Sequence, residues 1–209
     1  DRASHPLLRS VMSYYTDTFL NSQRTLIRGA PAFEAMSVED VLPHVRADDS
    51  PEVRSMLSDY ISAAREIIEN DAQVSLVQRT TTIYLDCFPC GPIEIRYPPV
   101  QAVTSVAYVD NAGDTQTLAA ELYRVDLTSR PGRIYPAYSQ TWPTTLDVTN
   151  AVTVTTTTGY TSAVLIPQCA KQALRIAVKS MYDNGGVLCD DVRNSVGMML
   201  APIRWEGGV

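Results

Sequence analysis

The hydrophobic residues between positions 51 and 70 recur at intervals of three and four, which places them along one side of an α-helix. They are Val53, Leu57, Tyr60, Ile61, Ala64, Ile67 and Ile68. The other side is predicted to carry the charged residues Glu52, Arg54, Asp59, Arg65, Glu66 and Glu69. Ser50 can accept a hydrogen bond from a free amide of the first turn, and Pro51 suits the first helical position. The pattern therefore predicts a long amphipathic helix that needs a partner for its apolar stripe.

A second stripe of hydrophobic and mostly small residues runs through positions 167–183. Its members are Ala170, Ala173, Leu174, Ala177, Val178, Met181 and Tyr182. Small residues on such a stripe let another helix approach closely. Gly185 and Gly186 end the pattern, as glycines commonly do after a helix. We expect this helix to pack against the helix at 51–70.

Between these helices, from about 74 to 159, the helical pattern gives way to alternating polar and apolar residues with many β-branched side chains. The candidate strands are 77–85, 93–97, 103–109, 116–118, 123–126, 133–134 and 151–158. Asp110 to Gly113 have the composition of a hairpin loop. The strands are rich in threonine, so we expect one face of the sheet to be wet.

The fold class predicted from these patterns is α+β, with a small helical bundle that carries a β-rich insertion. A short helix at 38–46, capped by Ser37 with Asp40 three residues later, is expected to complete the bundle. The bundle core would comprise residues 37–73 and 160–186, and the insertion residues 74–159.

The two terminal segments carry apolar residues without a persistent helical or strand period. Residues 1–36 are interpreted as an extended arm or a short helix followed by a linker. Residues 187–209 contain many hydrophobic residues, but no long helical pattern that would bury them. This tail either folds back on its own core or docks on another chain, and we favour docking. Asp190 and Asp191 are expected in a solvated loop.

Composition narrows the possible partners. The net charge is −6 and the pI is about 4.9, which argues against tight wrapping of nucleic acid, because that requires clustered lysine and arginine. No hydrophobic run approaches the ~20 residues that span a bilayer, so we expect no membrane partner. Four cysteines do not make a disulfide scaffold in a chain of 209 residues.

Cys87-Phe88-Pro89-Cys90 is a local motif with possible chemistry. A zinc site needs two further ligands, and the remaining cysteines and the two histidines form no second pair. A redox pair of this kind normally opens a helix, whereas Gly91 and Pro92 follow here. We interpret these cysteines as structural. The sequence predicts no catalytic, cofactor-binding or metal-binding residue and no enzyme activity.

Three stretches of the β-rich region follow one another in a recognisable order. They are IEIRYPPVQAVTSVAYVDNAGDTQTL, YRVDLTSRPGRIYPAYSQTWP and AVTVTTTTGYTSAVLIPQCAKQALRIAVKSMYDN. With SVEDVLPHVRADDSPEVRSMLSDYISAAREIIEN upstream, the chain resembles the head–tail connector family of long-tailed phages and related gene-transfer particles, also called adaptor or head-completion proteins. The order and spacing of these stretches carry the resemblance, which covers about residues 37–184.

The resemblance implies a ring of subunits that lies beneath the portal protein and extends the DNA channel toward the tail. In this family the ring usually has twelve subunits. Such a ring needs two different patches on each subunit and a rotation that closes. By resemblance, the portal contact would be made by the C-terminal residues Met198, Leu200, Ile203 and Trp205. The next tail-side component would contact the turn formed by Asp110, Asn111, Gly113 and Asp114.

The implied location is the neck of the virion, after assembly in the host cytoplasm. DNA would pass through the lumen without specific binding, because an acidic surface repels phosphates. Two other functions stay open. One is another neck or tail component, a stopper or a tail terminator, although a helical bundle is less typical of those proteins. The other is a small metal- or thiol-dependent enzyme that uses Cys87 and Cys90.

Overall fold

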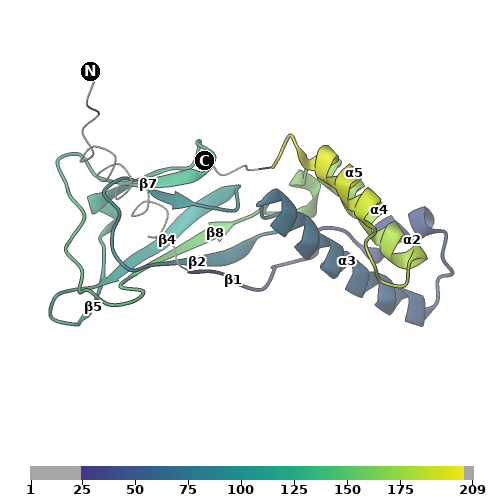
Figure 1. The fold of residues 1–209 in the computed structure, drawn as a ribbon, viewed down its shortest axis with the longest axis horizontal. Helices are drawn as coiled ribbons and strands as arrows, with labels where there is room; N and C mark the ends of the chain where they lie inside the picture. The colour runs from purple at the N-terminus through teal and green to yellow at the C-terminus, as the bar shows by residue number, and fades with distance from the viewer. Residues whose placement is uncertain (1–24, 205–209) are drawn as a thin grey trace, which may run out of the picture.

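The computed structural model describes residues 25–204, which form an elongated molecule with helices at one end and two antiparallel sheets at the other (Figure 1). The α-helices in this part of the chain are α2 (Val38–Val45), α3 (Pro51–Ala72), α4 (Gln168–Asp183) and α5 (Asp190–Leu200). The predicted α+β class is confirmed, and every strand except the one at Thr25–Arg28 lies in sequence between the long helices α3 and α4.

The larger sheet has five strands in the order β1-β2-β8-β4-β5. Their bounds are β1 (Thr25–Arg28), β2 (Arg79–Leu85), β8 (Val152–Thr158), β4 (Val100–Val109) and β5 (Thr115–Thr117). The smaller sheet has the order β3-β7-β6, with bounds β3 (Ile93–Ile95), β7 (Gly132–Pro136) and β6 (Tyr123–Asp126). All paired neighbours in both sheets are antiparallel.

Both predicted helix starts are confirmed. The Ser37 side chain accepts from the Asp40 amide at 3.3 Å, and the Asp40 carboxylate accepts in return from the Ser37 amide at 3.2 Å. The Ser50 hydroxyl accepts from the amide of Val53 at 3.3 Å, and Pro51 occupies the start of α3. These caps satisfy donors that a helix cannot satisfy internally at its first turn.

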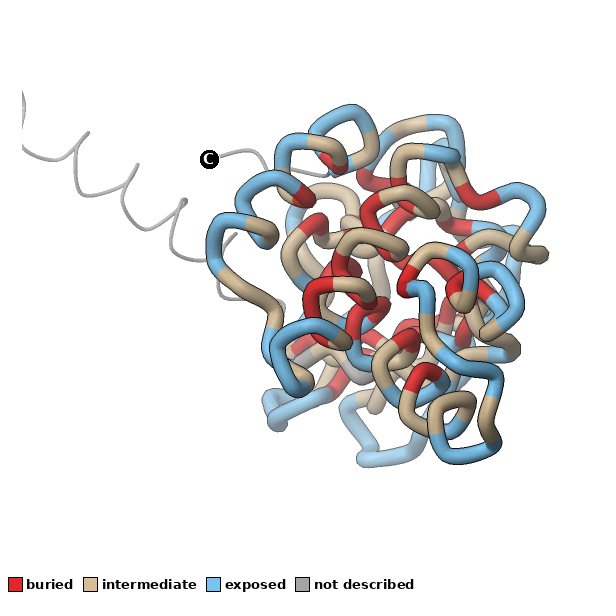
Figure 2. The backbone as a smooth tube through the Cα atoms, turned by 90° about the vertical axis from the view of Figure 1, so that its right-hand side faces the viewer, coloured by how far each residue is buried: buried red, intermediate tan, exposed pale blue. Residues whose placement is uncertain are grey.

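Helix α4 packs against α3, as its small residues predicted, and it also contacts α2 and α5. Figure 2 looks onto the helical end and shows buried positions gathered toward the centre of the molecule. The central side chains of this bundle core are Leu57, Ile61, Ala64, Ile68, Ala170, Ala173, Leu174, Ala177 and Val178. No helix within residues 25–204 is both long enough and apolar enough to cross a membrane.

The expectation of a solvated loop at Asp190 and Asp191 was wrong. Asp190 and Asp191 do not lie in a loop but form the exposed first turn of α5, where carboxylates interact favourably with the helix dipole. Val192, Val196 and Leu200, spaced four residues apart, turn inward against the bundle core. This segment therefore folds back on its own subunit.

The N-terminal expectation was also wrong where the structure describes it. Residues 25–28 form the edge strand β1 instead of an arm or linker, with Thr25 opposite Tyr84 and Arg28 opposite Thr81. A strand this short has too few residues to show a period, and its pairing with β2 defines it. Residues 1–24 lie outside the described part of the chain.

The threonine-rich sheet is only partly as predicted. Alternate residues of β8 are half-buried on one face, but Thr156 and Thr158 on the other face are fully buried. Thr158 Oγ1 lies 2.8 Å from Thr81 Oγ1 and 3.1 Å from Ser75 Oγ, and Thr156 Oγ1 donates to the Thr81 carbonyl at 3.1 Å. These hydroxyls are buried because they satisfy one another.

Gly159 ends β8 in a conformation that only glycine tolerates. Its φ is +94°, and a Cβ atom would lie 2.0 Å from the Val77 carbonyl oxygen. Its amide donates to the Pro99 carbonyl at 2.8 Å. This close approach turns the chain from the sheet toward α4.

Candidate functional surfaces

A buried carboxylate lies where the helices meet the larger sheet. Glu69 of α3 is fully buried, and its Oε1 accepts from the Leu76 amide at 2.8 Å. Its Oε2 accepts from Arg79 of β2 at 2.8 Å and from Arg65 at 3.3 Å, and Arg28 of β1 lies 3.5 Å away. Burying a carboxylate requires such partners. The cluster therefore ties the end of α3 to two strands and has a structural role.

Arg65 and Glu69 were predicted on the solvent face of the helix, and both are buried. They flank the apolar stripe on the side where Glu34, Arg28 of β1 and Arg79 of β2 lie. Arg65 also donates to Glu34 at 2.8 and 3.1 Å. Burial alone would raise the pKa of Glu34, but the hydrogen bonds and charge of Arg65 outweigh it, so the pKa is lowered. Burial lowers the pKa of Arg79.

The C-terminal residues predicted to contact a partner lie in different environments. Leu200 is 1% exposed and belongs to the bundle core, and Ile203 packs partly buried against that core. Met198 is 73% exposed on α5. Trp205 lies outside the described residues. Of the described members of this set, only Met198 presents most of its side chain to solvent.

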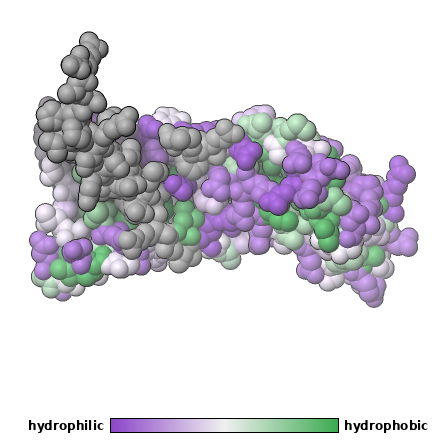
Figure 3. Space-filling model, viewed as in Figure 1, coloured by the Kyte–Doolittle hydropathy of each residue, from purple (hydrophilic) through white to green (hydrophobic). Residues whose placement is uncertain are grey.

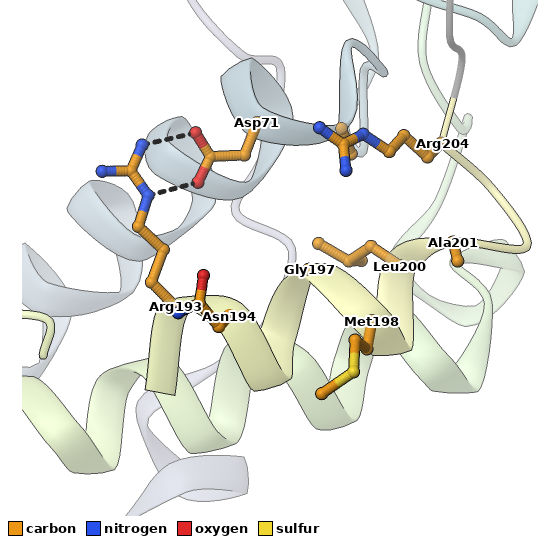
Figure 4. Close-up of a pocket in the computed structure, with 9 residues that line it drawn as sticks. Asp71, Arg193, Asn194, Gly197, Met198, Leu200, Ala201 and Arg204 are labelled. Carbon is orange, nitrogen blue, oxygen red and sulfur yellow. Dashed lines mark hydrogen bonds and ion pairs between the residues drawn. The ribbon is translucent and has the colours of Figure 1, made fainter. Parts of the chain in front are cut away.

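Met198 borders a groove between α5 and the end of α3, with a volume of about 460 Å³ (Figure 4). The other lining residues are Asp71, Ala72, Arg193, Asn194, Gly197, Leu200, Ala201 and Arg204. Arg193 spans the groove edge and donates to Asp71 at 2.8 and 2.6 Å, which raises the pKa of Arg193. The lining combines charge with one exposed thioether and contains no acid–base or nucleophile pair.

The turn between β4 and β5 is exposed and internally hydrogen-bonded. Asp110 accepts from the amide of Asp114 at 3.0 Å and from the Gln116 side chain at 2.9 Å, and the Gln116 bond is the main cause of its lowered pKa. Gly113 adopts a φ of +90°, as the loop prediction required. Asn111, Gly113 and Asp114 are exposed. The turn is therefore a preformed, accessible projection.

Cys87 and Cys90 are both free and exposed. Between them, Phe88 stacks on Trp142 with ring centroids 4.9 Å apart and meets the edge of Tyr108 at 5.8 Å. This aromatic cluster explains the loop as a packing element. Among residues 25–204, no group of three or more histidine, cysteine, aspartate or glutamate side chains is placed to hold a metal ion.

Large hydrophobic side chains are exposed at several places on the β end. They are Leu122, Val125, Leu127, Tyr135, Tyr138 and Val148. Others near or on the helices are Val164, Leu165, Val187 and Met198. Figure 3 shows hydrophilic residues over much of the visible helical end, with smaller hydrophobic areas between them. Apart from Met198, sequence patterns did not identify these positions, because one exposed apolar residue has the same local signature as a buried one.

No protein-family model and no curated protein matches the sequence. Solved structures of gene transfer agent (GTA) particles do match the fold. A chain from the neck of an empty GTA particle, computed with C6 symmetry, aligns with a TM-score of 0.71 at 20% identity. A chain from the virion of a native GTA particle aligns with a TM-score of 0.69 at 21% identity.

A third match is a chain from the neck of a native GTA particle, computed with C12 symmetry, with a TM-score of 0.60 at 21% identity. All three alignments cover 88% of this chain and 99% of the other chain. The bundle with its β insertion is therefore shared with chains of GTA particles over nearly their whole length. This likeness is consistent with the resemblance of the sequence to head–tail connector proteins.

Proposed function

We propose that this protein is a structural subunit of a virion neck, a head–tail connector that forms a ring beneath the portal protein. The observation that carries the proposal is the fold match, which spans 99% of a GTA neck chain at a TM-score of 0.71. The C6 and C12 symmetries of the matched neck structures support a ring of identical subunits, and we propose twelve. The ring would extend the DNA channel and present a surface to the tail.

The C-terminal segment is the proposed portal contact, with its role divided between two kinds of residue. Leu200 and Ile203 hold α5 on the bundle core, while Met198 and the groove beside it offer an accessible surface. Trp205 follows directly after the groove residue Arg204 and belongs to the same proposed contact. A partner side chain placed beside Met198 could bury its thioether without rearranging the bundle.

The turn containing Asp110, Asn111, Gly113 and Asp114 is the proposed contact for the next neck or tail protein. It projects from the β end, and its hydrogen bonds fix its shape before binding. Preformed loops lose less conformational entropy on binding than flexible ones. DNA would pass the acidic ring without specific binding, because the net charge of −6 per chain opposes contact with phosphates.

The test is reconstitution with the portal protein of the same particle, followed by negative-stain imaging and native mass measurement. We expect a closed ring that binds the portal, and the Met198→Asp variant should form the ring but bind the portal more weakly. Gly113→Pro should leave portal binding unchanged and weaken only the tail-side contact. A chain that stays a 23.0-kDa monomer with the portal present would contradict the proposal.

The same reconstitution separates the alternatives. A stopper or a tail terminator would bind a neck or tail component and ignore the portal. A zinc- or thiol-dependent enzyme would lose metal or activity in the Cys87→Ser variant. In the proposed connector, Cys87→Ser should leave the ring and its portal binding unchanged.

A further inference from the structure

The outward face of α4 carries a basic stripe, defined as Lys171, Arg175 and Lys179. The three residues are spaced four apart, so they lie along one side of the helix, and all three are half-exposed. Lys171 and Lys179 are the only lysines in the chain. A protein with a net charge of −6 thus gathers all of its ammonium groups on one helix face.

The outward face of α3 carries an acidic stripe, defined as Glu52, Asp59 and Glu66. These residues are spaced seven apart, which returns to nearly the same side of a helix every two turns, and all three are exposed. The exposed positions between them include the small residues Ser55 and Ala63. Small neighbours leave the carboxylates accessible to a second surface.

The two stripes point away from each other. Leu57, Ile61 and Ala64 of α3 face the bundle core, and so do Ala173 and Leu174 of α4. The two helices pack together through these faces. Each charged stripe lies on the opposite side of its helix, so the stripes occupy two different sides of the bundle. This is the arrangement that a head-to-tail contact between identical subunits requires.

Few contacts within the subunit engage these charges. Lys179 pairs with Asp183 of its own helix at 2.9 Å, and Glu66 lies 3.8 Å from Arg65. Within residues 25–204, no ion pair joins Lys171, Arg175, Glu52 or Asp59 to another side chain. The stripes thus keep most of their charge available to a partner.

We infer that the basic stripe on α4 of one copy docks on the acidic stripe on α3 of the next copy, forming the interface that closes the ring. The inference rests on the proposed function, since it specifies how that ring is made. At about 1.5 Å per residue, the two lysines lie ~12 Å apart along α4 and successive carboxylates ~10.5 Å apart along α3. Both lysines can therefore meet two consecutive carboxylates at once.

Charge pairs of this kind orient and speed association more than they add affinity. They also weaken as salt rises, because exposed charges are screened over about 8 Å at physiological ionic strength. Ring assembly should therefore slow and weaken between low and high salt. An apolar interface would show the opposite trend.

Carbodiimide cross-linking tests the contact directly, since it joins lysine amines to carboxylates that touch. A mixture of ¹⁴N- and ¹⁵N-labelled protein separates links between copies from links within one. We expect mixed-isotope peptides joining residues 168–183 to residues 51–72, and same-copy links from Lys179 to Asp183. Mixed links from either lysine only to other parts of the chain would overturn the inference.

Charge reversal gives a second test with its own rescue. The double variant Lys171→Glu/Lys179→Glu and the double variant Glu52→Lys/Asp59→Lys should each reduce the ring fraction at least tenfold. Mixing the two variants should restore assembly, because twelve alternating copies pair a basic face with an acidic face at every contact. The quadruple variant, which reverses both sides, should restore it as well. Restored assembly also shows that the reversed chains fold.

The matched control reverses one acidic and one basic residue at the β end, Glu121→Lys and Arg124→Glu, both exposed. It should leave the ring fraction unchanged. If the wild type forms a ring and each of the two double variants alone forms it equally well, this interface is wrong while the proposed function stands. If the wild type forms no ring even with its portal, the proposed function itself fails.

Discussion

The helical end and the β end of this molecule present different surfaces. The outward faces of α3 and α4 are charged, with Glu52, Asp59 and Glu66 on one and Lys171 and Lys179 on the other. Most of the large hydrophobic side chains that are exposed belong to the β end, including Tyr138 at 89% exposure. Charged faces orient a binding partner, whereas exposed apolar side chains contribute favourable free energy when a partner buries them. The two ends are therefore suited to different kinds of contact.

The interior of the molecule is also divided between the two ends. Each end has its own apolar core, one among the helices and one between the sheets. The boundary between them is polar, with the Glu69 carboxylate and its arginines beside the hydroxyls of Ser75, Thr81 and Thr158. Hydrogen bonds are directional where apolar contacts are not. This polar boundary fixes the angle between the two ends.

The largest effect is expected from Glu69→Ala, which leaves Arg28, Arg65 and Arg79 without their shared carboxylate. Breaking a buried ion pair by removing one partner costs about 3–5 kcal/mol. Urea unfolding should show this loss of stability. The helical end and the β end should then unfold at different urea concentrations instead of in one transition. Glu66→Ala, on the exposed side of the same helix, should change stability by less than about 0.5 kcal/mol. Equal losses in the two variants would contradict a structural role for the cluster.

A smaller effect is expected at the hydroxyl cluster. Thr158→Val keeps the shape of a buried strand residue but removes the hydrogen-bond partner of Ser75 and Thr81. Leaving a buried hydroxyl unpaired costs about 1–3 kcal/mol. The control Thr157→Val, half-buried on the other face of β8, should be close to neutral. Thermal unfolding of the two variants measures the difference, and its absence would mean that the hydroxyls add nothing to the boundary.

Gly197→Ala should stabilise the helical end directly. Gly197 lies within α5, its φ is not in the left-handed region, and a Cβ atom there would meet nothing within 4 Å. Alanine in place of a helical glycine typically gains about 0.5–1 kcal/mol. If the polar boundary couples the two ends, the free energy of unfolding reported by a probe at the β end should rise by the same amount as that reported by a probe at the helical end. A shift confined to the helical signal would show that the ends unfold independently.

The smallest effect concerns pH. The pKa of Glu34 is held below its ordinary value of 4.5 because the Arg65 hydrogen bonds outweigh the effect of burial. A lowered pKa in the folded state stabilises the protein above about pH 4.5, and this contribution is lost as the pH falls through the folded value. Denaturant titrations between pH 6 and 3 should therefore fall less steeply for Glu34→Gln than for the wild type. Parallel curves would exclude a contribution from Glu34.

The sequence predicted the elements whose periods extend over several turns or strands. Helices α3 and α4 were found because their apolar stripes repeat, and both the Ser37 and Ser50 caps were read from local chemistry. Helix α5 was missed because only three of its residues face the core and because Gly197 interrupts the helical pattern of the sequence. Strand β1 was missed because four residues show no period, so only its tertiary pairing defines it.

The candidate surfaces were less accessible to sequence reasoning than the fold. The turn at Asp110 was recognised from residues that are local in sequence, and its shape follows from them. The burial of Arg65 and Glu69 depends on partners outside the helix, Glu34 and Arg79, so a helical wheel places them in solvent. Leu200 and Met198, two residues apart on one helix, share a composition pattern but face opposite ways.

The position of strands β2 to β8 between α3 and α4 also sets an order of events on the ribosome. Helix α3 leaves the exit tunnel long before α4, the partner that covers its apolar stripe, has been translated. At about 5–20 residues per second, the stripe waits roughly 5–20 seconds for that partner. During this interval the part of the stripe that α4 will cover is open to chaperone contact or to early association with another polypeptide. Codon choice across the strands would therefore affect the yield of folded protein without changing a single side chain.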